Sequence, residues 1–142
     1  YGFSLPLHLD TGASTNYIDK EVVRFHWLQE NTLTNPITVY NADGSLNGKA
    51  VIKTSITLLM QVGSHIEEIE FLICKASVPL VLGYLWLRKH NPEIDWHANQ
   101  VHLTRCPCSC SSALIRWREE HPRFHPQPLF PVANLLGPLW SW

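Results

Sequence analysis

Hydrophobic and polar residues alternate along several stretches of this chain, which is typical of strands that bury one face. Over residues 50–60 the even positions are Ala, Ile, Thr, Ile, Leu and Met. The odd positions are Val, Lys, Ser, Thr, Leu and Gln, so we expect a half-buried strand with its even face inward. Residues 66–74 repeat the pattern, with Ile69, Phe71 and Ile73 on one face.

Shorter apolar stretches predict the remaining strands, and turn-forming residues lie at the ends of each stretch. Alternation or a short apolar run predicts strands over residues 5–10, 37–40, 79–82, 94–96 and 101–103. The last two are expected to pair as a hairpin. Two further turns are expected, one over residues 41–45 around Asp43 and Gly44 and a two-residue loop at 63–64.

A short helix is predicted near the N-terminus, over residues 18–25. Ile18, Val22 and Phe25 fall on one face of this helix, which gives it an apolar side. Asp19 is expected to cap its first turn, since a short polar side chain can accept from the free N–H groups there.

A second helix is predicted over residues 84–90, where Pro92 prevents it from continuing. Residues 31–36 are polar and end in a proline, so a loop is expected there. Many short strands with turn signals every ~8–12 residues predict an all-β, barrel-like domain with one or two short helices.

The character of the sequence changes after residue 103. A cluster of cysteines is followed by a proline-rich run, with Pro122, Pro126, Pro128, Pro131 and Pro138. Prolines at this density interrupt regular structure. We therefore expect one folded domain over residues 1–103 and a Cys/Pro-rich linker or tail over residues 104–142, leading toward a downstream domain of a longer polypeptide.

Composition and charge give no support to some classes of partner. The chain has 142 residues, of which 45% are hydrophobic and 16% are charged, and its net charge is -1. Hydrophobic content of this size supplies a real core, whereas a charge near zero gives no reason to expect a nucleic acid or membrane partner. No apolar run approaches the ~20 residues that span a bilayer.

The four cysteines do not form a disulfide framework. Cys74 lies within a predicted strand and is expected to be a buried free thiol, and the others, Cys106, Cys108 and Cys110, alternate too closely to bridge one another. Free thiols favour a reducing, intracellular location. The histidines near this cluster in the sequence are His102, His121 and His125. The Cys-x-Cys-x-Cys spacing does not match known zinc sites, so no metal or cofactor is expected.

Candidate chemistry is concentrated in residues 7–14, Leu-His-Leu-Asp-Thr-Gly-Ala-Ser. A strand leads directly into the polar turn Asp10-Thr11-Gly12. Glycine lets the backbone approach closely, and the threonine hydroxyl can bond a neighbouring main chain. A carboxylate at a strand end, flanked by apolar sequence, is a candidate general acid or base.

These residues carry a family resemblance. Residues 9–14 resemble the active-site signature of retropepsin-like aspartic proteases. About 70 residues later, residues 81–87 (Val-Leu-Gly-Tyr-Leu-Trp-Leu) and 90–96 (His-Asn-Pro-Glu-Ile-Asp-Trp) resemble the protease segment of gypsy-type LTR retrotransposon polyproteins. The two motifs at this separation are much more specific than either alone.

The resemblance implies a closed retropepsin-like β-barrel and an aspartic endopeptidase that cuts its polyprotein. It implies a homodimer acting on a polypeptide substrate, in the cytoplasm or in a virus-like particle. The catalytic residues would be Asp10, Thr11 and Gly12, with Thr11 bonding across the twofold axis. The substrate-binding residues would be Ala13 in the cleft and, in a mobile flap, Ala42, Asp43, Gly44 and Ser45.

Two other interpretations stay open. The domain would be an inactive retropepsin-like module that dimerises or binds peptides, or else a monomeric barrel with one carboxylate that binds small ligands. Asp95, in the final hairpin, is expected to have a structural role rather than to be a second catalytic carboxylate.

Overall fold

The computed structural model describes residues 2–41, 43–62, 65–107, 110 and 130–132. The helices that lie within these described ranges are α1 (Lys20–Phe25) and α2 (Tyr84–His90). The strands are β1 (Leu7–Leu9), β2 (Tyr17–Asp19), β3 (Asn31–Tyr40), β4 (Leu46–Val62), β5 (His65–Cys74), β6 (Leu80–Leu82), β7 (Glu93–Asp95), β8 (Gln100–His102) and β9 (Phe130–Val132). None of the helices in the described ranges is both long and apolar enough to cross a membrane.

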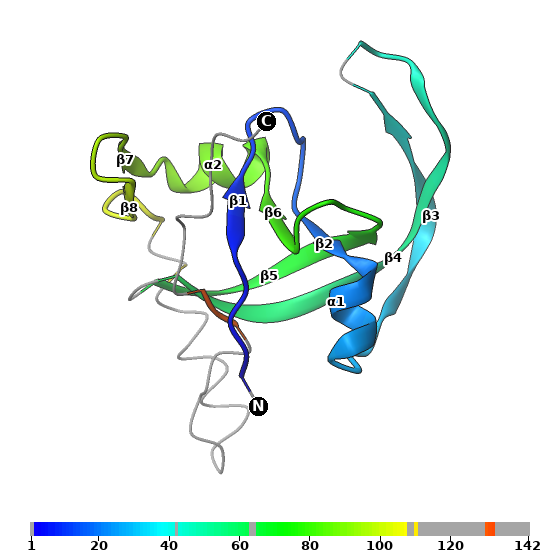
Figure 1. The fold of residues 1–142 in the computed structure, drawn as a ribbon, viewed down its shortest axis with the longest axis horizontal. Helices are drawn as coiled ribbons and strands as arrows, with labels where there is room; N and C mark the ends of the chain where they lie inside the picture. The colour runs from blue at the N-terminus through cyan, green and yellow to red at the C-terminus, as the bar shows by residue number, and fades with distance from the viewer. Residues whose placement is uncertain (1, 42, 63–64, 108–109, 111–129, 133–142) are drawn as a thin grey trace.

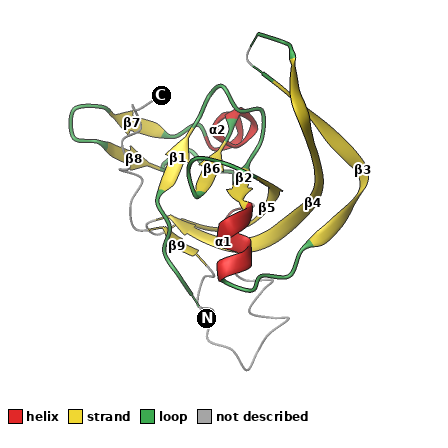
Figure 2. Cartoon of the chain, turned by 45° about the vertical axis from the view of Figure 1, so that its right-hand side comes forward, coloured by secondary structure: helices red, strands yellow, loops and turns green. Residues whose placement is uncertain are grey.

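Most strands belong to one sheet, in the order β1-β6-β2-β5-β4-β3, with β9 alongside β4. The sheet is mixed, with both parallel and antiparallel pairs. Strand β1 runs parallel to β6, and β2 runs parallel to β5 but antiparallel to β6. Strands β7 and β8 form a separate hairpin, as the sequence predicted. The described part of the chain is therefore mostly β, with α1 and α2 as short helices (Figure 2).

The expected closure into a barrel is not observed among the described residues. The sheet is an open path that begins at β1 and ends at β3, and β3 pairs with β4. The long strands β3 and β4 leave the body of the sheet as a curved hairpin (Figure 1). A strand that swings away from the core in this manner is not in position to pair with β1.

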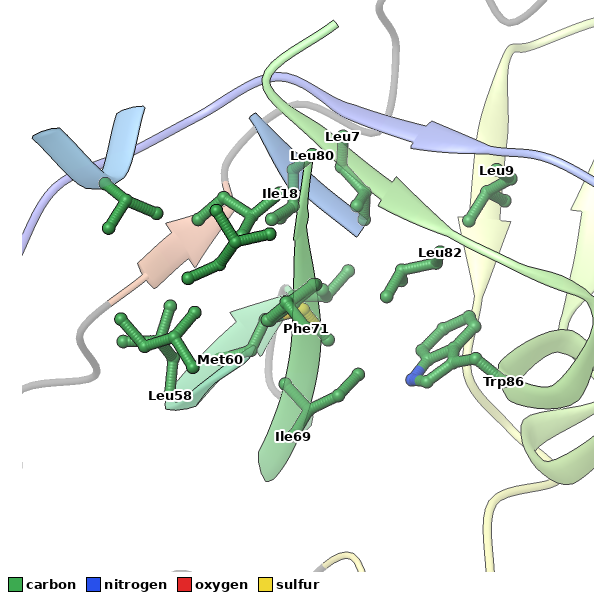
Figure 3. Packing of buried hydrophobic residues seen from close by; sticks show 14 residues of the cluster. Leu7, Leu9, Ile18, Leu58, Met60, Ile69, Phe71, Leu80, Leu82 and Trp86 are labelled. Carbon is green, nitrogen blue, oxygen red and sulfur yellow. The ribbon is translucent and has the colours of Figure 1, made fainter. Parts of the chain in front are cut away.

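The core lies on one face of this sheet, and its residues come from elements between β1 and α2. It contains Leu7, Leu9, Ile18, Val23, Ile56, Leu58, Met60, Val62, Ile69, Phe71, Ile73, Leu80, Leu82 and Trp86. Figure 3 shows Phe71 at its centre and Trp86 packing from α2. The inward even face of β4 is confirmed, although Ser55 and Leu59 on its odd face are buried as well, and the apolar face of β5 is confirmed. Burying such side chains contributes about 1.5–3 kcal/mol each.

The predicted first helix begins too early. Residues 17–19 form the strand β2, and the helix starts at Lys20. Asp19 holds the N-cap position without a side-chain cap bond, and its Oδ1 accepts from the N–H of Ala76 at 3.0 Å instead. Val23 is the buried residue of the helix, whereas Phe25 is 78% exposed. Pairing with β5 and β6 overrides the helical pattern here.

The predicted loop over residues 31–36 is also wrong, because these residues belong to β3. Pro36 is tolerated since β3 is the last strand of the sheet, where a missing N–H leaves no central ladder bond unmade. The register of β3 on β4 shifts between Thr32 and Ile37, around this proline. Helix α2 matches its prediction at both ends.

Two other predictions fall partly outside the described residues. The turn at 63–64 lies outside them, although Val62 and His65 on either side form a pair of the β4–β5 ladder. In the tail, β9 pairs with Met60, Gln61 and Val62 of β4. The division into residues 1–103 and 104–142 stays a prediction.

Candidate active site

The Asp10 loop connects β1 to β2 and is held by backbone contacts to β6. The N–H of Asp10 donates to the carbonyl of Leu82 at 2.9 Å and so extends the β1–β6 ladder by one bond. The N–H of Gly12 donates to Oδ1 of Asp10 at 2.8 Å, and a Cβ at position 12 would lie 3.1 Å from that oxygen. The loop thus fixes a half-buried carboxylate in a defined direction.

The second motif, at residues 81–87, supports this loop through backbone hydrogen bonds. The N–H of Tyr84, the first residue of α2, donates to the carbonyl of Ala13 at 2.7 Å, and the N–H of Leu85 donates to that of Ser14 at 3.2 Å. A Cβ on Gly83 would lie 2.0 Å from the carbonyl oxygen of Thr15. Position 83 must therefore be glycine, which gives a physical reason for the pairing of the two motifs.

Asn16 is a supporting residue that the sequence did not indicate. Its Oδ1 accepts from the N–H of Gly83 at 3.1 Å, and its carbonyl accepts from the N–H of Leu72 at 2.9 Å. It therefore joins the end of the Asp10 loop to both β5 and the start of α2. An asparagine between a loop and a strand has no distinctive sequence signal, because such residues are common in ordinary turns.

A cleft of about 1190 Å³ opens beside the Asp10 loop. Asp10, Gly12 and Ala13 line one side of it, and residues 37–40 and 51–54, in the arms of the β3–β4 hairpin, line the other. In Figure 1 the β3–β4 hairpin lies opposite the loop that connects β1 to β2. A cleft this large is of the size that holds extended ligands rather than a single small ion.

The tip of the hairpin is a tight turn held by its own hydrogen bonds. Oδ1 of Asp43 accepts from the N–H of Ser45 at 2.9 Å and from its hydroxyl at 2.6 Å, and these bonds lower the pKa of Asp43. Gly44 has a φ of 84°, which favours glycine. None of Asp43, Gly44 and Ser45 is among the described residues that line the cleft, and Ala42 lies outside the described residues. Their role as a flap stays a prediction.

Among the described residues that line the cleft, Asp10 is the only aspartate. The carboxylates among the described cleft-lining residues are Asp10 and Glu30, and Glu30 is an exposed residue just before β3. Asp95 closes the turn after β7, where its Oδ1 accepts from the N–H groups of His97 and Ala98 at 3.0 and 2.9 Å. Thr11 is exposed at the loop. The structural role predicted for Asp95 is confirmed.

A second polar cluster, which the sequence analysis missed, lies at the other end of α2. The Glu67 side chain is buried, the indole N–H of Trp86 donates to it, and the Nε2 atoms of His65 and His90 lie 3.3 and 3.2 Å from its oxygens. Burial acts to raise the pKa of Glu67, but these contacts outweigh burial and lower it to about 2. The carboxylate is therefore ionised in the interior.

Two cysteines from the segment after β8 face the same histidines. Sγ of Cys106 lies 3.4 Å from Nδ1 of His90 and 3.5 Å from Nδ1 of His65. Sγ of Cys110 lies 3.6 Å from Nδ1 of His90. Burial, together with the nearby Glu67 carboxylate, raises the pKa of Cys110 to about 11.

The sequence itself matches a known family. A family model described as the PEG10/RTL1 protease domain matches residues 7–112, which include the Asp10 loop, the second motif and both cysteines of the cluster. This match confirms the retropepsin-like resemblance. The chain belongs to the PEG10/RTL1 protease domain family, a retropepsin-like group that derives from gypsy-type retrotransposons.

Proposed function

We propose that this domain is an aspartic endopeptidase that becomes active when two copies bring their Asp10 side chains together. The observation that carries the proposal is the position of Asp10, a half-buried carboxylate fixed by Gly12 at the wall of a large cleft. Peptide hydrolysis of this type needs a base and an acid on either side of one water. Asp10 is the only aspartate among the described cleft-lining residues, so a twofold axis would supply the second.

In the proposed dimer, one carboxylate is ionised and removes a proton from water, while the other is protonated and polarises the peptide carbonyl. Two full negative charges ~4 Å apart repel by about 4 kcal/mol at an effective dielectric near 20. The pair therefore keeps one proton over a broad range of pH. Thr11, exposed on the same loop, would bond to the partner's main chain and hold the two loops together.

The substrate would be an extended polypeptide. The cleft runs between the Asp10 loop and the arms of a long hairpin, and its lining mixes apolar side chains such as Ile37 and Val51 with Lys20, Lys53 and Lys75. An extended chain can lie along such a groove and place alternate side chains on opposite walls. The proposed setting is the cytoplasm or a virus-like particle, and the free thiols of Cys74, Cys106 and Cys110 are compatible with a reducing environment.

The direct test is cleavage of a library of long peptides, with and without pepstatin. We expect turnover by the native protein, inhibition by pepstatin, and a loss of at least about 10⁴-fold in Asp10→Asn, because neither acid nor base remains. Glu70→Gln, which alters an exposed carboxylate of β5, is the matched control and should keep full activity. Equal turnover by Asp10→Asn and the native protein would rule out aspartyl catalysis.

A mixing experiment tests the need for two aspartates. Native and Asp10→Asn chains are combined in equal amounts and allowed to exchange. The rate is compared with that of a sample of native chains alone at the same total chain concentration. Random pairing leaves about one quarter of the dimers with both carboxylates, so the rate should fall to about one quarter. A rate of one half would mean that each chain works alone. Peptide binding without turnover would instead favour the inactive, peptide-binding module.

A further inference from the structure

Four side chains that commonly bind metals converge near the C-terminal end of α2. His65 begins β5, His90 ends α2, and Cys106 and Cys110 follow β8. One ligand atom from each lies within 4.8 Å of all the others. We propose that His65, His90, Cys106 and Cys110 bind one Zn²⁺ ion in a closed, structural site, which is independent of the proposed peptidase activity.

The distances agree with tetrahedral zinc coordination. Bonds of about 2.3 Å to sulfur and about 2.0 Å to nitrogen at tetrahedral angles place a nitrogen and a sulfur about 3.6 Å apart. Three of the four Nδ1–Sγ separations are 3.4, 3.5 and 3.6 Å. These three pairs therefore already have the separation that tetrahedral coordination of one ion requires.

The orientation of the two imidazoles also favours a metal. Each ring directs Nδ1 toward cysteine sulfur and Nε2 toward a different oxygen of Glu67, at 3.3 Å for His65 and 3.2 Å for His90. Histidines that bind metals usually direct their second N–H to a carboxylate, which fixes the tautomer. Neither Nε2 has a well-aligned hydrogen bond as the rings stand. A metal at Nδ1 would fix the hydrogen on Nε2, facing Glu67.

A buried carboxylate with two histidines does not by itself explain the arrangement. Such a group accounts for the Nε2 side of each ring, but it gives no reason for two thiols to face the Nδ1 atoms. A thiol is a weak hydrogen-bond donor, and His90 is fully buried. Two thiolates neutralise the charge of Zn²⁺, while Glu67 and the indole N–H of Trp86 form the surrounding shell.

The ligand types select zinc. Two sulfurs and two imidazole nitrogens suit Zn²⁺, whereas Mg²⁺ and Ca²⁺ require oxygen ligands. Four protein ligands leave no open coordination position, so the site is structural rather than catalytic. Three residues separate Cys106 from Cys110, which lies within the usual range of two to four for zinc-binding cysteines.

The first experiment measures metal in the whole chain, purified anaerobically with Zn²⁺ present and freed of excess ion. We expect one zinc per chain, with X-ray absorption showing two sulfurs at about 2.3 Å and two nitrogens at about 2.0 Å. Replacement by Co²⁺ should give the intense visible absorption of a tetrahedral thiolate site. Metal below about one tenth of an equivalent, or a first shell of oxygens, would overturn the proposal.

Variants then assign the ligands. Cys106→Ser, Cys110→Ser and His90→Gln should each weaken zinc binding by more than about 100-fold, measured by competition with a chelating dye. Cys74→Ser is the matched control, because Cys74 lies at the end of β5 opposite His65, and it should keep one zinc. Equal loss in Cys74→Ser, or a Cys106–Cys110 disulfide in the anaerobic protein, would contradict the site. If a ligand variant fails to fold, the absorption spectrum of the native protein still decides the question.

Discussion

The two ends of α2 support two different kinds of site. At its N-terminal end, backbone N–H groups of Tyr84 and Leu85 hold the Asp10 loop, and the contact depends on a glycine before them. At its C-terminal end, His90 meets side chains from two distant segments. Backbone contacts depend on close approach and tolerate many side chains, whereas the second site requires four specific residue types. One rigid helix of seven residues therefore links a candidate catalytic loop to a candidate metal centre.

Gly83→Ala is expected to have the largest effect, because it disrupts the N-terminal end of α2. The added methyl would lie 2.0 Å from one backbone oxygen and 2.7 Å from another, so the Asp10 loop or the helix must move. We expect a loss of at least about 3 kcal/mol in the free energy of unfolding and no measurable peptidase activity. Urea unfolding followed by circular dichroism measures the first, and peptide cleavage the second. A stability change below about 1 kcal/mol would contradict the close approach.

Glu67→Gln tests the opposite end of the helix. The ligands of the proposed zinc site remain, but the outer carboxylate loses its charge, so zinc affinity should fall about 10–100-fold. Competition with a chelating dye measures this change. Glu68→Gln, which alters the exposed neighbour, is the control and should bind zinc as the native protein does. Unchanged affinity in Glu67→Gln would show that the carboxylate does not orient the histidines.

Asn16→Ala should destabilise the N-terminal end of α2 by less than Gly83→Ala does. It removes one hydrogen bond to the N–H of Gly83 and leaves that group without its partner, at a cost of about 1–2 kcal/mol. Because the loop beside it carries Asp10, the peptidase rate should fall while zinc content stays at one per chain. Asn35→Ala, on exposed β3, is the control. Loss of zinc from Asn16→Ala would mean that the two ends are not independent.

Gly44→Ala should have the smallest effect of the four changes. No atom lies within 4 Å of the position that its Cβ would occupy, so the cost arises from the φ of 84° alone, about 1 kcal/mol. Comparison with Gly83→Ala separates backbone strain from steric collision at two glycines of the same chain. If the hairpin tip closes over substrate, the Michaelis constant should rise while unfolding free energy changes little. An unchanged Michaelis constant would argue against the flap.

Much of the secondary structure could be predicted because its signals are local. The alternation along β4 and β5 and the limits of α2 appear in neighbouring residues, and the structure confirms them. The errors at Asp19 and over residues 31–36 have one cause. There, pairing with strands distant in sequence decides the conformation, so β2 interrupts a helical pattern and Pro36 is accommodated at a sheet edge.

The candidate sites divide in the same way. The Asp10 motif is continuous, so it is recognisable before any fold is known. In the sequence the cysteines form one alternating cluster, which conceals the wider spacing of Cys106 and Cys110. The histidines that face Cys106 are His90 and His65, which lie 16 and 41 residues from it along the chain. His65 and His90 carry no motif, and no periodicity connects them to the cysteines.

The sequence by itself determined the family, the position of the candidate catalytic aspartate Asp10 and the main strands of the sheet, because each depends on residues close together along the chain. The tertiary structure alone decided that the sheet is an open path, that Gly83 lies under the Asp10 loop, and that two histidines and two cysteines meet around Glu67. Those features depend on contacts between residues distant in sequence, such as His90 with Cys106, 16 residues apart, and Asn16 with Gly83, 67 residues apart. Contacts at such separations form only when the folded segments pack together, so no periodic pattern in the sequence indicates them.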